Sequence, residues 1–164
     1  MRRPLLACLA IAAALALGCA GSAGGGTALP TWPEWVAQSG PPPAGQGRIV
    51  VYGAVRDEAL EWHPEVLVDG APIGRSRELT FLVAERPPGL HVLTIGTEER
   101  DAAFGTQGDS GNATVPLRAG QTAYVQLLVE APPGMVRATL VPMDPPTGNR
   151  DVQAMQLAPP STAP

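Results

Sequence analysis

The chain has two histidines, so imidazole chemistry must centre on His63 or His91. In the stretch EWHPE, Glu61 and Glu65 stand two residues to either side of His63. On a β-strand these three side chains would share a face, and their nitrogen and oxygen atoms could form a weak metal site. Pro64 favours a turn instead. We therefore expect polar surface residues here, with no metal and no cofactor.

His91 follows the turn sequence RPPG and falls on the same strand face as Leu93 and Ile95. A histidine beside a turn commonly hydrogen-bonds exposed backbone groups. We expect a structural histidine that bonds the turn backbone, and the alternative is a catalytic base or a ligand contact.

The stretch GDSGN, residues 108–112, resembles the nucleophile segment of chymotrypsin-like proteases. A nucleophilic serine needs a base within hydrogen-bond reach and a third group to orient that base. The chain is too short for that two-barrel enzyme, and Asn112 breaks the pattern. The acidic residues near TEERD, 97–101, do not have the spacing of a calcium loop. We predict polar loops here, and no enzyme activity.

Two loop residues are candidates for ligand binding. Trp62 could supply an aromatic platform for a sugar, and Asp109 belongs to a long polar loop, 97–112. This alternative is a ligand- or glycan-binding protein that uses loops at one end of its domain. A small hydrolase that depends on His63 and His91 is a third, weaker alternative.

The residues before Cys19 form the most specific motif in the sequence. Arg2 and Arg3 precede an apolar run of thirteen residues, Leu5 to Leu17, which is the length of a signal-peptide core and too short to cross a bilayer as a helix. Cys8 lies inside that run, so its removal would leave one thiol and no intrachain disulfide.

The end of that run, LALGC, resembles the bacterial lipobox. The resemblance implies cleavage between Gly18 and Cys19 and a lipid on the Cys19 thiol, although Leu17 replaces the small residue usual there. Several acyl chains such as palmitate would hold the protein durably on a membrane. Ala20 in place of aspartate implies sorting to the outer membrane, with the protein facing the periplasm.

Composition divides the chain into four parts. Residues 1–18 are the expected signal peptide, and 19–46 are an expected flexible linker rich in Gly, Ala, Ser and Pro. Within the linker, Thr31 and Glu34 fit a capping box on one short turn that carries Trp32 and Trp35. The tryptophans could pack on the domain, sit at the membrane interface or bind a partner. The domain itself spans 47–143, and a tail, Pro-rich at its end, follows at 144–164.

Within the domain, short runs of Val, Leu, Ile and Thr alternate with turn residues, which indicates strands. A tight turn is expected at Asp69-Gly70, and Pro116 predicts an edge strand because it has no N–H to donate. We expect Leu79, Phe81 and Val83 to share one face. The strands are predicted at 48–55, 65–68, 78–85, 90–95, 113–118, 122–130 and 136–143.

Alternation is clearest at 122–130, where Ala123, Val125, Leu127 and Val129 oppose Tyr124, Gln126 and Glu130. Such alternation predicts a sheet with one buried face and one solvated face. About seven strands without a helix favour an all-β, two-sheet sandwich, and a small barrel is the alternative.

The segment VLVDGAPIGRSRELTFLVAERPPGLHVLTI resembles PEGA-like immunoglobulin-fold modules and a related group of bacterial envelope lipoproteins with a prealbumin-like sandwich. The later segment LRAGQTAYVQLLV also resembles that group. The likeness covers 48–143, apart from the unmatched loop at 97–112. It implies an immunoglobulin-like fold and is silent on function, because the shared residues are structural.

Charge limits the class of partner. All eleven basic residues are Arg, and fifteen acidic residues give a net charge of −4, or −6 without the segment ending at Gly18. An acidic chain without a basic stripe is not expected to bind nucleic acid. We expect a membrane-anchored, non-catalytic interaction or structural module whose partner is another envelope protein or a cell-wall polymer.

Overall fold

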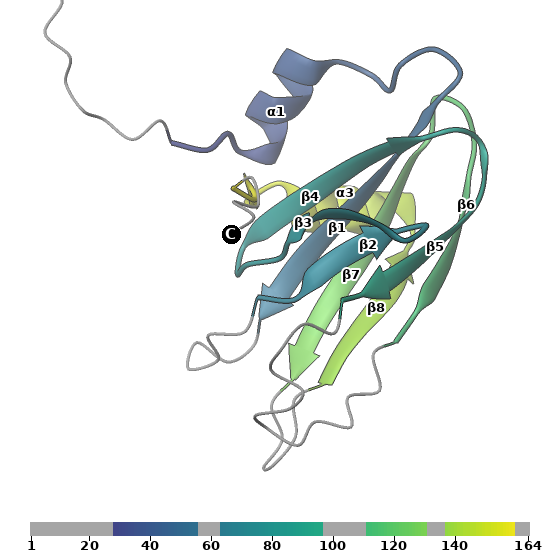
Figure 1. Ribbon diagram of the computed structural model, residues 1–164. Helices are drawn as coiled ribbons and strands as arrows, with labels where there is room; N and C mark the ends of the chain where they lie inside the picture. The colour runs from purple at the N-terminus through teal and green to yellow at the C-terminus, as the bar shows by residue number, and fades with distance from the viewer. Residues whose placement is uncertain (1–27, 56–62, 97–110, 131–136, 160–164) are drawn as a thin grey trace, which may run out of the picture.

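The protein is a β-sandwich with an additional layer of helix, as the computed structural model shows for residues 28–55, 63–96, 111–130 and 137–159 (Figure 1). The described elements, in chain order, are α1 (Trp32–Ser39), β1 (Gly47–Val55), β2 (Glu65–Val68), β3 (Ala71–Arg75), β4 (Thr80–Arg86), β5 (Gly89–Ile95), β6 (Ala113–Leu117), β7 (Thr122–Glu130), β8 (Arg137–Met143), α3 (Pro145–Val152) and β9 (Gln156–Leu157).

The strands form two separate sheets. One has five strands in the order β8-β7-β1-β4-β9, and the other has four in the order β3-β2-β5-β6. Most neighbours are antiparallel, but β1 pairs parallel with β7 along its length, and β9 pairs parallel with β4. The mostly β, two-sheet architecture expected from the sequence is confirmed.

The main core lies between the two sheets. The five-stranded sheet contributes one face of β1, β4, β7 and β8, and the four-stranded sheet contributes one face of β2, β5 and β6. Its members include Ile49, Val51, Leu93, Val125 and Leu127, each no more than 1% exposed. Alternating strands supply this core, as the sequence pattern predicted.

The five-stranded sheet has a second apolar face, which α1, α3 and the segment around β9 cover. Val50 and Tyr52 of β1, Phe81 of β4 and Tyr124 of β7 are buried there. The expectation that Tyr124 faces solvent is therefore wrong. The continuous run Ile49–Tyr52 is buried on both sides because β1 is the central strand of the middle layer.

The two helices of the described residues lie in segments that we expected to be linker and tail. α1 begins with the predicted capping box, in which Glu34 accepts hydrogen bonds from the backbone and side chain of Thr31, and it extends well beyond one turn. α3 follows Asp144, whose side chain accepts from the Thr147 N–H as an N-cap. The expectation of a fold without helices is therefore wrong for these flanking segments.

Local turn chemistry follows the sequence closely. Asp69 and Gly70 both have positive φ and close the two-residue hairpin between β2 and β3. Pro116 lies on β6, an edge strand, as predicted. Leu79 is an exception, because it is 59% exposed in the turn before β4 and does not share the face of Phe81. Strand β3 and strand β9 were not predicted.

Candidate functional site

The site is built on a tryptophan pair in α1. Trp32 and Trp35 stack with ring centroids 5.5 Å apart, because their spacing places them on one side of the helix. Trp32 is only 4% exposed and meets the rings of Phe81 and Tyr124 edge-on, at 5.2 and 6.1 Å. Of the three alternatives for this pair, packing on the domain is confirmed.

A buried arginine joins α1 to the sheet. The Arg48 guanidinium lies with its central carbon 4.5 Å from the centroid of the Trp35 ring, and its Nη2 is 2.7 Å from Oε1 of Glu85 on the neighbouring strand. Nη1 donates to the Gly40 carbonyl at 3.0 Å, where α1 ends. This buried positive charge is thus matched by one carboxylate, one carbonyl and one aromatic face.

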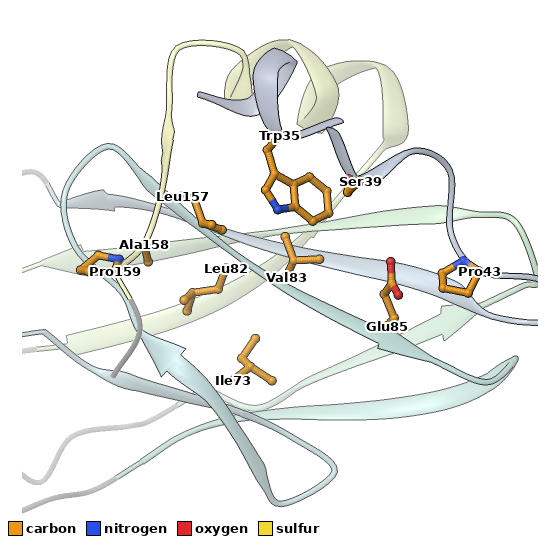
Figure 2. Close-up of a pocket in the computed structure, with 10 residues that line it drawn as sticks. All are labelled: Trp35, Ser39, Pro43, Ile73, Leu82, Val83, Glu85, Leu157, Ala158 and Pro159. Atoms are coloured by element: carbon orange, nitrogen blue, oxygen red, sulfur yellow. The ribbon is translucent and has the colours of Figure 1, made fainter. Parts of the chain in front are cut away.

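Beside this cluster a groove of about 550 Å³ follows the outer edge of β4 (Figure 2). Figure 2 shows Val83 and Leu82 at the centre, with Trp35 on one side and Ile73 of β3 on the other. Leu157, Ala158 and Pro159 close one end, and Glu85 and Pro43 stand at the opposite end. The volume is within the range of small-molecule sites.

The edge of β4 at the centre of this groove is only partly paired. On this side, the Gln156 N–H donates to the Leu79 carbonyl and the Ala158 N–H to the Phe81 carbonyl. The pairing with β9 ends there. In the sequence, Pro159 and Pro160 follow Ala158, and a proline has no N–H to donate to a neighbouring strand.

Strand alternation shows which backbone groups remain on the open side. Leu82 and Ala84 direct their N–H and C=O groups toward β1. The alternate residues Val83 and Glu85 therefore direct theirs to the opposite, open side of β4, as Phe81 does. The Glu85 carbonyl accepts from Arg86 Nη1 at 2.9 Å. Among the described residues we find no backbone partner for the Val83 N–H, the Val83 carbonyl or the Glu85 N–H.

This arrangement offers groups of the kind that bind an extended chain. An unpaired strand edge supplies alternating donors and acceptors, and the apolar groups around it supply surface to bury. Glu85 is the one charged residue among the described residues that line the groove, and Arg48 balances its charge. The groove therefore favours an uncharged, extended ligand.

No family model matches this chain. A search of curated proteins also finds no match. No helix of the described residues is long and apolar enough to cross a membrane.

Several residues singled out from the sequence cannot be placed in the site. The expected lipid attachment residue Cys19, the cleavage residue Gly18 and the possible ligand contacts Trp62 and Asp109 all lie outside the described residues. Glu61 does too, so the metal alternative around His63 is not tested there. Within the described ranges, no three His, Cys, Asp or Glu side chains could hold a metal ion together.

His91 has the structural role predicted for it. Its Nε2 is 2.8 Å from the Pro87 carbonyl in the preceding turn, and its Nδ1 is 2.7 Å from Oδ2 of Asp69. The other oxygen of Asp69 accepts from the Val92 N–H, which ties the β2–β3 hairpin to β5. These hydrogen bonds, that of His91 first, hold the pKa of the Asp69 carboxyl below its ordinary value.

Sequence reasoning missed the groove, although two of its signals are local. The unbroken apolar run Ile49–Tyr52 is typical of a strand covered on both faces, which requires a third layer above the sheet. The pair Pro159-Pro160 directly after QLA marks a strand that cannot continue.

Proposed function

We propose that the protein is a lipid-anchored envelope lipoprotein whose β-sandwich binds other components of the envelope and is not catalytic. The observation that carries the binding role is the apolar groove along the partly paired edge of β4. A sheet edge left open inside an apolar groove is suited to bind another chain, because it offers backbone hydrogen bonds and apolar contact together.

The anchor in this proposal comes from the sequence. An apolar core after two arginines and the ending LALGC support acylation at Cys19. With the protein on the outer membrane and facing the periplasm, a binding domain on a tether would search for partners near that surface. Another envelope protein is the favoured partner, and a cell-wall polymer is the second.

The finer fold type is also part of the proposal. The residues that carry the resemblance to PEGA-like and prealbumin-like modules make up β2, β3, β4, β5 and β7. The arrangement of these strands in two stacked sheets is compatible with an immunoglobulin-like sandwich. We therefore propose this type for residues 47–143.

Lipid attachment can be tested with matched cysteine variants. Cells that produce the full chain are fed an alkyne-bearing fatty acid, and the purified protein is then examined for label and by intact mass. Wild type and Cys8→Ser are expected to carry the label and sediment with membranes, and Cys19→Ser is expected to do neither. A labelled Cys19→Ser chain, or an unlabelled wild type, would overturn the anchor.

The binding role is tested separately by crosslinking in intact cells. We expect a photo-reactive residue on the exposed surface of the domain to yield a discrete adduct with a neighbouring envelope protein, identified by mass spectrometry. If photo-reactive residues placed around the whole surface give only background adducts, the interaction role is wrong.

A further inference from the structure

We propose that the open edge of β4 accepts an extended apolar segment of another envelope protein, which adds as a strand to the five-stranded sheet. This inference rests on the proposed interaction role and identifies its binding mode. The three backbone groups at Val83 and Glu85 that have no backbone partner among the described residues are those that an incoming strand would pair.

The side chains of such a strand would be covered on both sides. A strand added beyond β4 enters between two layers, with Trp35 and Leu157 on the helix side and Ile73 and Leu82 on the side of the other sheet (Figure 2). Since side chains of a strand alternate between its faces, both sets would meet apolar atoms. The segment that fits is therefore apolar at consecutive positions.

The existing contacts indicate where this strand would lie and how long it would be. It would continue the line of β9, whose pairing to β4 already occupies the first part of the same edge. Ala158 and Pro159 stand at one end, and at the other the Arg86 side chain already satisfies the Glu85 carbonyl. A short segment of about three to five residues fills the distance between them.

A free peptide segment fits this edge better than a second copy of the chain. The edge of β4 lies between residues of α1 and its following loop on one side and β3 on the other. Two copies that paired through their β4 edges would each bring these flanking elements to the interface, whereas a free peptide segment brings none. Charge agrees with an uncharged apolar segment, because Arg48 neutralises Glu85 beside the groove.

The test uses the full chain in mild detergent and a synthetic heptapeptide, KVLVIVK, as the probe. Amide hydrogen exchange is followed by NMR with and without the peptide. We expect exchange at Val83 and Glu85 to slow at least tenfold, while Leu82 and Ala84, which pair with β1, stay unchanged. The same peptide with N-methyl groups along one edge is expected not to protect them.

A pair of proline variants tests whether the peptide depends on the backbone hydrogen bonds of β4. Val83→Pro removes one outward donor and leaves the bonds between β1 and β4 in place, so the affinity for the peptide is expected to fall at least tenfold. Thr114→Pro is the matched control, because it stands two residues before Pro116 on the outer edge of β6. Unprotected Val83 and Glu85 amides at saturating peptide, or equal losses in both variants, would overturn the proposal.

Crosslinking in cells separates this inference from the proposed function. A benzophenone amino acid is placed at Ser39 on the rim of the groove or at Val92 on the exposed face of the other sheet. An adduct from Ser39 whose partner peptide is extended and apolar supports the inference. Adducts from Val92 alone would leave the interaction role standing and refute the groove, and a Ser39 adduct to a second copy would refute the peptide partner.

Discussion

Asp69 shows how one residue can serve both a turn and a long-range contact. Its positive φ suits the hairpin turn, and its two carboxylate oxygens reach His91 and the Val92 N–H on β5. The turn was predicted from the sequence, since Asp-Gly is a strong local signal. The hydrogen bond to His91 was not, because those residues are brought together only by the pairing of β2 with β5.

We predict that Asp69→Asn lowers the free energy of unfolding by about 1 kcal/mol at neutral pH, since the amide tolerates the turn but loses a charged acceptor. The folded-state pKa of Asp69 is below its ordinary value, so this stabilisation is complete above the ordinary pKa and is lost as pH falls through the folded pKa. Urea unfolding at a series of pH values should therefore show the two proteins converging below about pH 4. A difference that grows on acidification would contradict the assignment.

The two tyrosines of the chain allow a prediction at alkaline pH, as Asp69 does at acidic pH. Burial, followed by the neighbouring Asp151, raises the pKa of Tyr52, and burial raises the pKa of Tyr124. We predict little tyrosinate absorbance from the native protein at about pH 10, where tyrosines of the urea-unfolded chain are half ionised. Because the folded state retains the protons, stability is full below about pH 10 and falls as pH rises further. Equal absorbance in both states would show that these rings are exposed.

The helix α3 contacts the sheet through a glycine. A Cβ placed on Gly148 would come within 2.3 Å of the Tyr124 Cβ, so the helix can lie this close only without a side chain there. The hydroxyl of Tyr124 donates to Asn149 Oδ1 at 3.2 Å, and Trp32 Nε1 donates to the same oxygen at 3.4 Å. The side-chain amide of Asn149 on α3 thus links α3 to both α1 and β7, on the second face of the five-stranded sheet.

We predict that Gly148→Ala destabilises the protein by about 1–3 kcal/mol, because the methyl group forces α3 away from Tyr124. This reverses the usual effect, since alanine ordinarily stabilises a helix interior by about 0.5–1 kcal/mol relative to glycine. Thermal unfolding followed by circular dichroism measures it. Gly111→Ala is the control, because its Cβ would find ordinary contacts no closer than 3.5 Å. A stabilised Gly148→Ala protein would show that the helix is free to move.

Element by element, seven of the nine described strands could be predicted, and the short strands β3 and β9 and the two helices could not. The predicted strands show an alternation of apolar and polar residues, which requires only that one face of the strand be buried. α1 and α3 have eight residues each, too short to show helical periodicity, and α3 opens with two prolines. Their stability comes from packing on Phe81 and Tyr124, which the neighbouring residues in the chain do not reveal.

At the scale of the whole molecule, the C-terminal segment completes a second core. Val152 is fully buried and Met155 is 7% exposed against the aromatic residues of the middle sheet. The segment also supplies β9 and one end of the groove. The groove and the second core therefore depend on the same C-terminal segment.

We predict that a chain ending at Met143 loses several kcal/mol of stability, because it exposes Tyr52, Phe81 and Tyr124 and loses about 1.5–3 kcal/mol for each large apolar side chain left uncovered. Binding of a hydrophobic dye and urea unfolding measure the effect. A chain ending at Pro159 retains every described contact and serves as the control. If the shorter chain were as stable as wild type and bound no dye, the segment would be an accessory and the second core would be wrong.

The sequence alone determined features that depend on adjacent residues: the positions of all described strands except β3 and β9, the Asp69-Gly70 turn, the edge position of Pro116 and the turn-bonding histidine. Tertiary structure alone decided which segments cover the second face of the middle sheet, and with them the tryptophan pair, the Arg48–Glu85 contact and the groove. The physical reason is that periodicity reports only how often a side chain must be buried. Which element covers that side chain depends on packing between segments far apart in the chain, such as α1, β4 and β9.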